Sequence, residues 1–114
     1  MNNLLDLPSL ERISLGGYNM ESMDSFEIME LTSLHSIEIL DHSFNKGNGD
    51  FTISNCSSLC TLHLGNNVFR RYDRFVINGF SSLQSIIFDG YNFETANEFN
   101  LDGTFVLGSI IIFR

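Results

Sequence analysis

The side chains of this sequence that could support hydrolytic chemistry are two glutamates, Glu11 and Glu38, about one repeat apart. A glycan-cleaving enzyme needs acidic groups gathered on one surface together with a basic partner. Neither glutamate has an evident base near it in the sequence. The sequence also lacks the G-x-S-x-G, phosphate-loop, H-E-x-x-H and C-x-x-C motifs of common catalytic sites. We therefore expect a protein that is not an enzyme, and keep a glycan-active β-solenoid enzyme as the less favoured alternative.

Metal and cofactor sites are not expected from the sequence. The three histidines, His35, His42 and His63, do not follow a zinc-ligand spacing. The first repeat carries an acidic stretch consisting of Glu21, Asp24, Glu27 and Glu30, but the spacing of a calcium-binding loop is missing. An arginine cluster, Arg70, Arg71 and Arg74, is interpreted as offsetting nearby acidic charge, with an anion-binding patch as the alternative.

The two cysteines, Cys56 and Cys60, are too few for a disulfide framework. Cys56 occupies a position that is otherwise apolar in the repeat described below, so it is expected to be buried. Cys60 is expected to point away from the core. Because a disulfide needs converging side chains, we predict that the two residues are not bonded to each other.

Composition and charge narrow the classes of partner. The chain has 114 residues, an apolar content of 43 % and a net charge of −8. Such a sequence can bury a core, but its acidity argues against binding to nucleic acid or to an anionic membrane surface. No apolar stretch reaches the roughly 18 residues of a membrane helix, and no secretory signal is visible at the N-terminus. The sequence leaves the cellular location open.

A repeat of about two dozen residues positions these side chains. Leucines recur at spacings of 24, 25, 24 and 24 residues, namely Leu10, Leu34, Leu59, Leu83 and Leu107. Apolar residues follow three and five positions after each leucine. The second half of the unit repeats an aromatic column, Phe44, Phe69 and Phe93, and a Phe-x-Ile/Leu pair that begins at Phe26, Phe51, Phe75 and Phe99. The extra residue behind the 25-residue spacing falls in the glycine-containing segment 45–50, where a turn can absorb it.

Both halves of the unit alternate with a period of two, which indicates strands rather than helices. A lone strand of this kind cannot hide its apolar face, whereas copies stacked about 4.8 Å apart form parallel sheets around a continuous core. We predict a solenoid over residues 7–114, with repeats at about 7–30, 31–55, 56–79 and 80–103 and a partial one at 104–114. Residues 1–6 are expected to cover its first turn. Little or no helix is expected.

The sequence resembles leucine-rich-repeat proteins. The segment Leu59-x-x-Leu62-x-Leu64-x-x-Asn67-x-Phe69 matches the pattern L-x-x-L-x-L-x-x-N-x-L. The later Phe-x-Ile pairs look like the surface-antigen type of this family. The resemblance implies a right-handed superhelix that recognises proteins or other macromolecules on a concave parallel sheet. It departs from the family at the ninth position, which holds Tyr18, His42, Asn67 and Tyr91 and so cannot form an asparagine ladder. Hydroxyls of Ser33, Ser58 and Ser82 are the expected substitutes.

The expected binding surface consists of the outward-facing strand positions. Its central residues are Glu38, His63 and Ile87, flanked by Ser36, Thr61 and Ser85. Apolar side chains among polar ones on a rigid sheet are typical of interaction sites, although an ordinary solvated sheet would show the same pattern. The sequence therefore favours a protein-binding module, with a structural or adhesive segment of a larger surface repeat protein as the alternative. The apolar run 110–113 lies in the strand half of the fifth turn, which predicts self-association through that turn.

Overall fold

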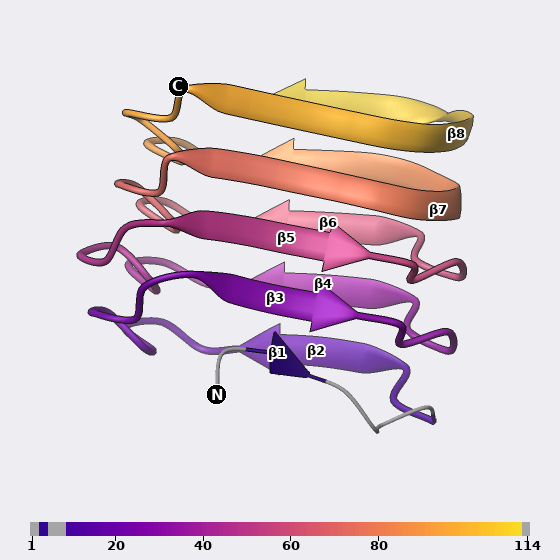
Figure 1. Cartoon of the computed structure of the whole chain (residues 1–114), viewed down its shortest axis with the longest axis horizontal. Helices are drawn as coiled ribbons and strands as arrows, with labels where there is room; N and C mark the ends of the chain where they lie inside the picture. Colours follow the sequence, from indigo (N-terminus) through magenta and orange to yellow (C-terminus); the bar gives the residue numbers. More distant parts are fainter. Residues whose placement is uncertain (1–2, 5–8, 113–114) are drawn as a thin grey trace.

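The chain forms a parallel β-solenoid of about 4 turns (Figure 1). This computed structural model describes the backbone of residues 3–4 and 9–112, and within it the side chains of residues 9–80 and 82–102. These residues contain strands and turns but no helix, and hence none long and apolar enough to cross a lipid bilayer. The expected parallel β-solenoid, with strands in both halves of each repeat, is confirmed.

Two sheets face each other across the core. The back sheet, the more distant one in Figure 1, contains β2 (Arg12–Leu15), β4 (Ser36–Ile39), β6 (Thr61–Leu64) and the final residues of β7 (Arg74–Phe88) and β8 (Glu98–Ile112). The front sheet contains β1 (Asn3–Leu4), β3 (Phe26–Met29), β5 (Asp50–Ser54) and the first residues of β7 and β8. In the last two turns one long strand therefore continues from the front sheet into the back sheet.

The strand register follows the sequence repeat. In the back sheet Ile13 pairs with Ile37, which lies beside Leu62, and each later strand adds a partner in the same column. In the front sheet Phe26 pairs with Phe51 and Phe51 with Phe75. The register shifts only where β7 and β8 turn between the sheets, and there Leu83 pairs with Phe105 rather than with Leu107. Residues two dozen apart in the sequence thus lie side by side.

Stacked aromatic rings form the centre of the core, as the repeat predicts. Phe44, Phe69 and Phe93 are fully buried, with ring centroids 4.7 Å and 5.6 Å apart from one turn to the next. The second column, headed by Phe26, interleaves with the first, and Phe51 lies 4.1 Å from Phe69. Burying each such ring contributes about 2–3 kcal/mol before the cost of ordering it.

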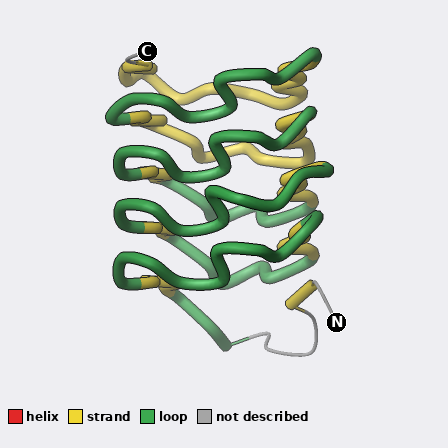
Figure 2. Tube along the Cα trace, turned by 90° about the vertical axis from the view of Figure 1, so that its left-hand side faces the viewer, coloured by secondary structure: helices red, strands yellow, loops and turns green. Residues whose placement is uncertain are grey.

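The corners of the solenoid use left-handed backbone conformations at residues other than glycine. All four residues at the ninth position of the repeat, and all four at the eleventh, have φ between 50° and 63°; they are Tyr18, His42, Asn67, Tyr91, Met20, Phe44, Phe69 and Phe93. This conformation is unusual for a bulky residue such as phenylalanine. Its recurrence gives the loops one shape from turn to turn (Figure 2). The buried rings offset the local backbone cost.

The two ends of the chain are described only in part. The predicted cover segment, residues 1–6, lies outside the described residues except for β1, which pairs with β3. The backbone of Ile110, Ile111 and Ile112 pairs with β7, but the side chains of the predicted apolar run lie outside the described residues. The residue bounds predicted for the repeats remain a prediction.

Candidate recognition surface

The six residues predicted to bind a partner lie together on the outward face of the back sheet. Ser36, Thr61 and Ser85 are paired neighbours in one column, and Glu38, His63 and Ile87 are paired neighbours in another. Alternate residues of these strands are buried in the core, so the six point away from it. All six are half-buried, because each packs against its neighbours on the adjacent strands. We call this set the back-sheet surface.

A carboxylate–imidazole–carboxylate cluster crosses the back-sheet surface. The Nε2 atom of His63 lies 3.0 Å from a carboxylate oxygen of Asp89, and its Nδ1 atom lies 3.6 Å from a carboxylate oxygen of Glu38. The three side chains come from different turns. Between 34 % and 37 % of each remains accessible to solvent. Asp89 thus lies within hydrogen-bonding distance of the imidazole ring, and Glu38 lies beside its other nitrogen, on an open surface.

Asp89 is a member of the cluster that the sequence analysis missed. The repeat places Ile87 directly beside His63, and Asp89 follows two positions later, just beyond the end of β7. Residues two apart on an extended chain face the same side. Asp89 therefore approaches His63 along the diagonal. A search for acidic residues in diagonal positions, rather than in the same column, would have found it.

Glu11, the other glutamate considered for hydrolytic chemistry, does not join this cluster in the structure. Glu11 is exposed and precedes β2, and its backbone carbonyl accepts hydrogen bonds from the amides of His35 and Ser36. In the residues that the structure describes, no group of three or more His, Cys, Asp or Glu side chains is arranged to hold a metal ion. The glutamate that lies beside a base on the sheet is Glu38.

The ninth-position column forms a mixed stack at the corner after the back sheet. Tyr18 stacks on His42 with ring centroids 4.9 Å apart, and the His42 ring nitrogen Nδ1 lies 3.3 Å from the side-chain amide nitrogen of Asn67. The guanidinium of Arg70 lies 5.6 Å from the ring centroid of Tyr91. The column therefore has no asparagine ladder, as its composition predicts.

The polar groups that bridge the corner loops are different from those predicted. The buried hydroxyl of Ser43 donates to the Gly16 carbonyl and accepts from the Asn19 amide. The buried amide of Asn92 donates to the carbonyls of Gly65 and Val68 in the previous turn. Ser43 and Asn92 follow the ninth position by one residue. The prediction assigned this role to Ser33, Ser58 and Ser82. Ser33 and Ser58 lie before β4 and β6, and Ser82 lies within β7, so all three are at the opposite end of the back-sheet strands. The described bonds that bridge these loops come instead from position ten.

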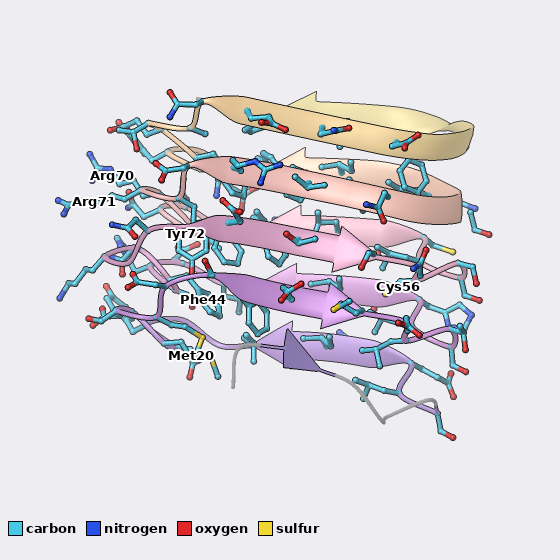
Figure 3. The ribbon with its side chains drawn as sticks, in the orientation of Figure 1. Met20, Phe44, Cys56, Arg70, Arg71 and Tyr72 are labelled. Atoms are coloured by element: carbon cyan, nitrogen blue, oxygen red, sulfur yellow. The ribbon has the colours of Figure 1, made fainter. Side chains whose placement is uncertain are left out.

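Most described cationic side chains pair with an acidic residue one turn away. Arg70 contacts Glu94 at 3.2 Å, and Arg74 bridges Asp50 at 3.1 Å and Glu98 at 3.2 Å. Lys46 lies 3.7 Å from Glu21. The hydrogen bond and charge of Glu98, with the charge of Asp50, raise the pKa of Arg74. Arg70 and Arg71 project from the loop edge (Figure 3). This pairing agrees with the predicted role of the arginine cluster in offsetting acidic charge.

The cysteines are both free, and they lie in different environments. Cys56 is 1 % exposed and fills the apolar column as predicted. Burial raises the pKa of its thiol, partly offset by a hydrogen bond from the Leu31 backbone. Cys60 is half-buried, and its thiol donates to the Ser58 carbonyl at 3.4 Å.

Comparisons of this chain with protein-family models, with curated proteins and with solved structures find no match. The functional argument therefore depends on the geometry of the surface itself.

Proposed function

We propose that this protein is a non-enzymatic recognition module that binds another protein, or a similar macromolecule, on the back-sheet surface. The observation that carries the proposal is the pairing of the two outward columns, Ser36–Thr61–Ser85 and Glu38–His63–Ile87, over strands in uninterrupted register. A partner meets side chains at fixed intervals on a backbone that has little freedom to move. Little conformational entropy is then lost on binding.

The chemistry of the surface indicates the kind of partner. Glu38 and Asp89 flank His63, so the centre of the surface carries two carboxylates. A basic residue of the partner would reach both carboxylates, and an apolar residue would pack on Ile87 beside them. Hydroxyls of Ser36, Thr61 and Ser85 can donate or accept hydrogen bonds along the neighbouring column. The partner that fits is a protein surface or segment with basic and apolar residues side by side.

The proposal has two further parts, the type of repeat and the role of the segment in a longer protein. The first is that the chain belongs to the surface-antigen type of leucine-rich repeats, with a right-handed superhelix and a concave back sheet; the repeat length of about 24 residues supports this property. In a longer repeat protein the same surface would extend over more turns, and the segment would then serve an adhesive or structural role.

A glycan-active enzyme is the second candidate, and the cluster around His63 is the observation in its favour. Glu38 and Asp89 supply two carboxylates with a base between them, gathered on one sheet from three turns. We prefer recognition because about a third of each side chain in the cluster is accessible to solvent, so that water competes for every polar contact, whereas catalytic groups usually lie where water is excluded.

Affinity capture from an extract tests the leading proposal. The wild-type chain is compared with His63→Ala/Ile87→Ala, after circular dichroism shows that both are folded. We expect a partner that the wild type retains and the double variant loses. Equal recovery of every partner by both proteins would contradict the proposal. Activity on a panel of polysaccharides that disappears in both Glu38→Ala and Asp89→Ala would favour the enzyme instead.

A further inference from the structure

The segment 45–50 carries the extra residue of the repeat, and it contains an asparagine–glycine pair, Asn48-Gly49. The pair lies in the loop that precedes β5, and the structure describes the turns on both sides of it. Its surroundings therefore belong to the middle of the solenoid.

An asparagine–glycine pair can react with itself because glycine has no side chain. The backbone nitrogen of the glycine can attack the Cγ atom of the asparagine, since no Cβ atom hinders closure of the succinimide ring. The attack needs a glycine amide that is free to lose its proton and an asparagine side chain that is free to turn toward it. A hydrogen bond from that amide, or strand pairing around it, opposes the reaction.

The structure provides these conditions at Asn48. This residue is exposed, and among the described residues no group bonds to its side-chain amide or accepts a hydrogen bond from the Gly49 N–H. The hydrogen bonds of the pair use other atoms. The Asn48 N–H donates to a carboxylate oxygen of Asp24, and the Asn48 carbonyl accepts from the amide of Ser25. The reactive amide is thus left unpaired in a loop that is otherwise held in place.

Two related pairs lack these conditions. Asn78-Gly79 lies within β7, where Asn78 is paired on both sides, with β5 and with β8. In Asp89-Gly90 the Gly90 amide is buried and donates to the side-chain oxygen of Asn92 at 2.9 Å. Both pairs therefore need local unfolding before they can react.

We propose that Asn48 of the folded protein is a site of spontaneous covalent modification by its neighbour Gly49. Hydroxide removes the proton of the Gly49 amide, and the nitrogen forms a bond to Cγ of Asn48. The bond from Cγ to Nδ2 breaks, and the leaving nitrogen takes a proton from water and departs as ammonia. Water then opens the succinimide at either carbonyl, which leaves an aspartate or an isoaspartate at position 48. This reaction does not depend on the proposed recognition function.

Both products alter the contact with the previous turn. An aspartate places a second carboxylate beside Asp24, whose side chain accepts the Asn48 N–H at 2.8 Å, and neighbouring like charges repel each other. An isoaspartate also adds one carbon to the main chain just ahead of Phe51, which stacks between Phe26 and Phe75. The isoaspartyl protein should therefore unfold at a lower urea concentration than Asn48→Asp, which carries the added charge alone. Equal midpoints would contradict this consequence.

Peptide mapping by mass spectrometry, on the full chain incubated in mildly alkaline buffer, tests the proposal. The rates at which Asn48 and Asn78 become aspartate and isoaspartate are measured in the native protein and in urea. Dividing each native rate by the rate in urea removes the effect of the neighbouring sequence. We expect this ratio to be at least about tenfold higher for Asn48 than for Asn78, because only Asn78 must wait for local unfolding.

Two conservative variants complete the test. Asn48→Gln should remove most of the ammonia released by the native protein, because the longer side chain closes its ring far more slowly. Asn78→Gln should leave that release unchanged. Equal ratios for the two asparagines, or undiminished ammonia release in Asn48→Gln, would overturn the proposal. His63→Ala should leave the conversion unchanged, so this test is independent of the back-sheet proposal.

Discussion

The phenol of Tyr72 donates a hydrogen bond of 2.6 Å to the backbone carbonyl of Met23, which lies two turns earlier and 49 residues away in the sequence. Gly47 belongs to the turn between them, and a side chain there would meet the same carbonyl. The missing side chain at Gly47 leaves room next to the Met23 carbonyl. Tyr72 lies inside the solenoid beside the Phe44 column (Figure 3), so one hydrogen bond links the first and the third of three successive turns.

Removing the Tyr72 hydroxyl should destabilise the fold while leaving the ring in place. Tyr72→Phe deprives the Met23 carbonyl of a donor, and we expect the free energy of unfolding to fall by about 1–2 kcal/mol. Urea denaturation followed by circular dichroism measures this change. Tyr18→Phe is the matched control, because the Tyr18 side chain is 69 % exposed. An equal effect of the two substitutions would show that the bond contributes nothing.

Stability should also fall at high pH because of Tyr72. Burial, and to a smaller extent the negative charge of Asp24, raise the pKa of Tyr72 above its ordinary value near 10. Above about pH 10 the unfolded chain loses this proton and the folded chain keeps it, so unfolding becomes more favourable by about 1.4 kcal/mol per pH unit. Below that pH the residue contributes no slope. Tyr72→Phe should show a shallower loss between pH 10 and 11, and an identical slope in both proteins would refute the assignment.

A methyl group at position 47 should disturb the same contact. The Cβ atom of Gly47→Ala would lie 2.7 Å from the Met23 carbonyl carbon and still closer to its oxygen. Since the obstacle is backbone, we expect a loss of about 1–3 kcal/mol in the free energy of unfolding. In Gly16→Ala the nearest atom is a side-chain nitrogen 3.8 Å away, so that variant should change stability by less than about 0.5 kcal/mol. The urea concentrations at the unfolding midpoints of both variants test this difference in stability.

The sequence predicted the contacts that repeat and missed those that do not. The Phe44, Phe69 and Phe93 column follows from one spacing, because each turn has to cover the apolar face of the last. The bond from Tyr72 to Met23 skips a turn, and the contact between His63 and Asp89 runs diagonally. Such contacts depend on how far a side chain reaches and on the left-handed corners. Neither can be read from the spacing of the apolar residues.

The two thiols should react at very different rates. Cys56 is buried and its thiol pKa is raised, whereas Cys60 is half-buried near the surface. Because the thiolate is the reactive form, we expect Ellman's reagent to modify Cys60 in the native protein at least about 100-fold faster than Cys56, which must wait for local unfolding. In urea both should react together. The native Cys60→Ser variant should hardly react with Ellman's reagent. Rapid reaction of that variant would contradict the burial of Cys56.

The stability of the fold should depend on the middle of the aromatic core more than on its end. The ring of Phe69 is fully buried among Phe44, Phe51, Tyr72 and Phe93 at centroid distances of 4.1–5.6 Å. Phe69→Ala opens a cavity that neighbouring turns, fixed by their backbone ladders, can close only in part. The expected loss is about 3–5 kcal/mol.

Phe99 is the matched comparison, because it has the same side chain and remains 38 % exposed. Phe99→Ala leaves an opening that solvent can fill, so we expect less than half the effect of Phe69→Ala, measured as the difference in urea midpoint at a constant denaturant slope. If Phe69→Ala does not fold, the pair Phe69→Leu and Phe99→Leu preserves the comparison with smaller effects in the same order. A larger loss at Phe99 would mean that the end of the stack, rather than its interior, determines stability, and that the stacked columns do not act as one core.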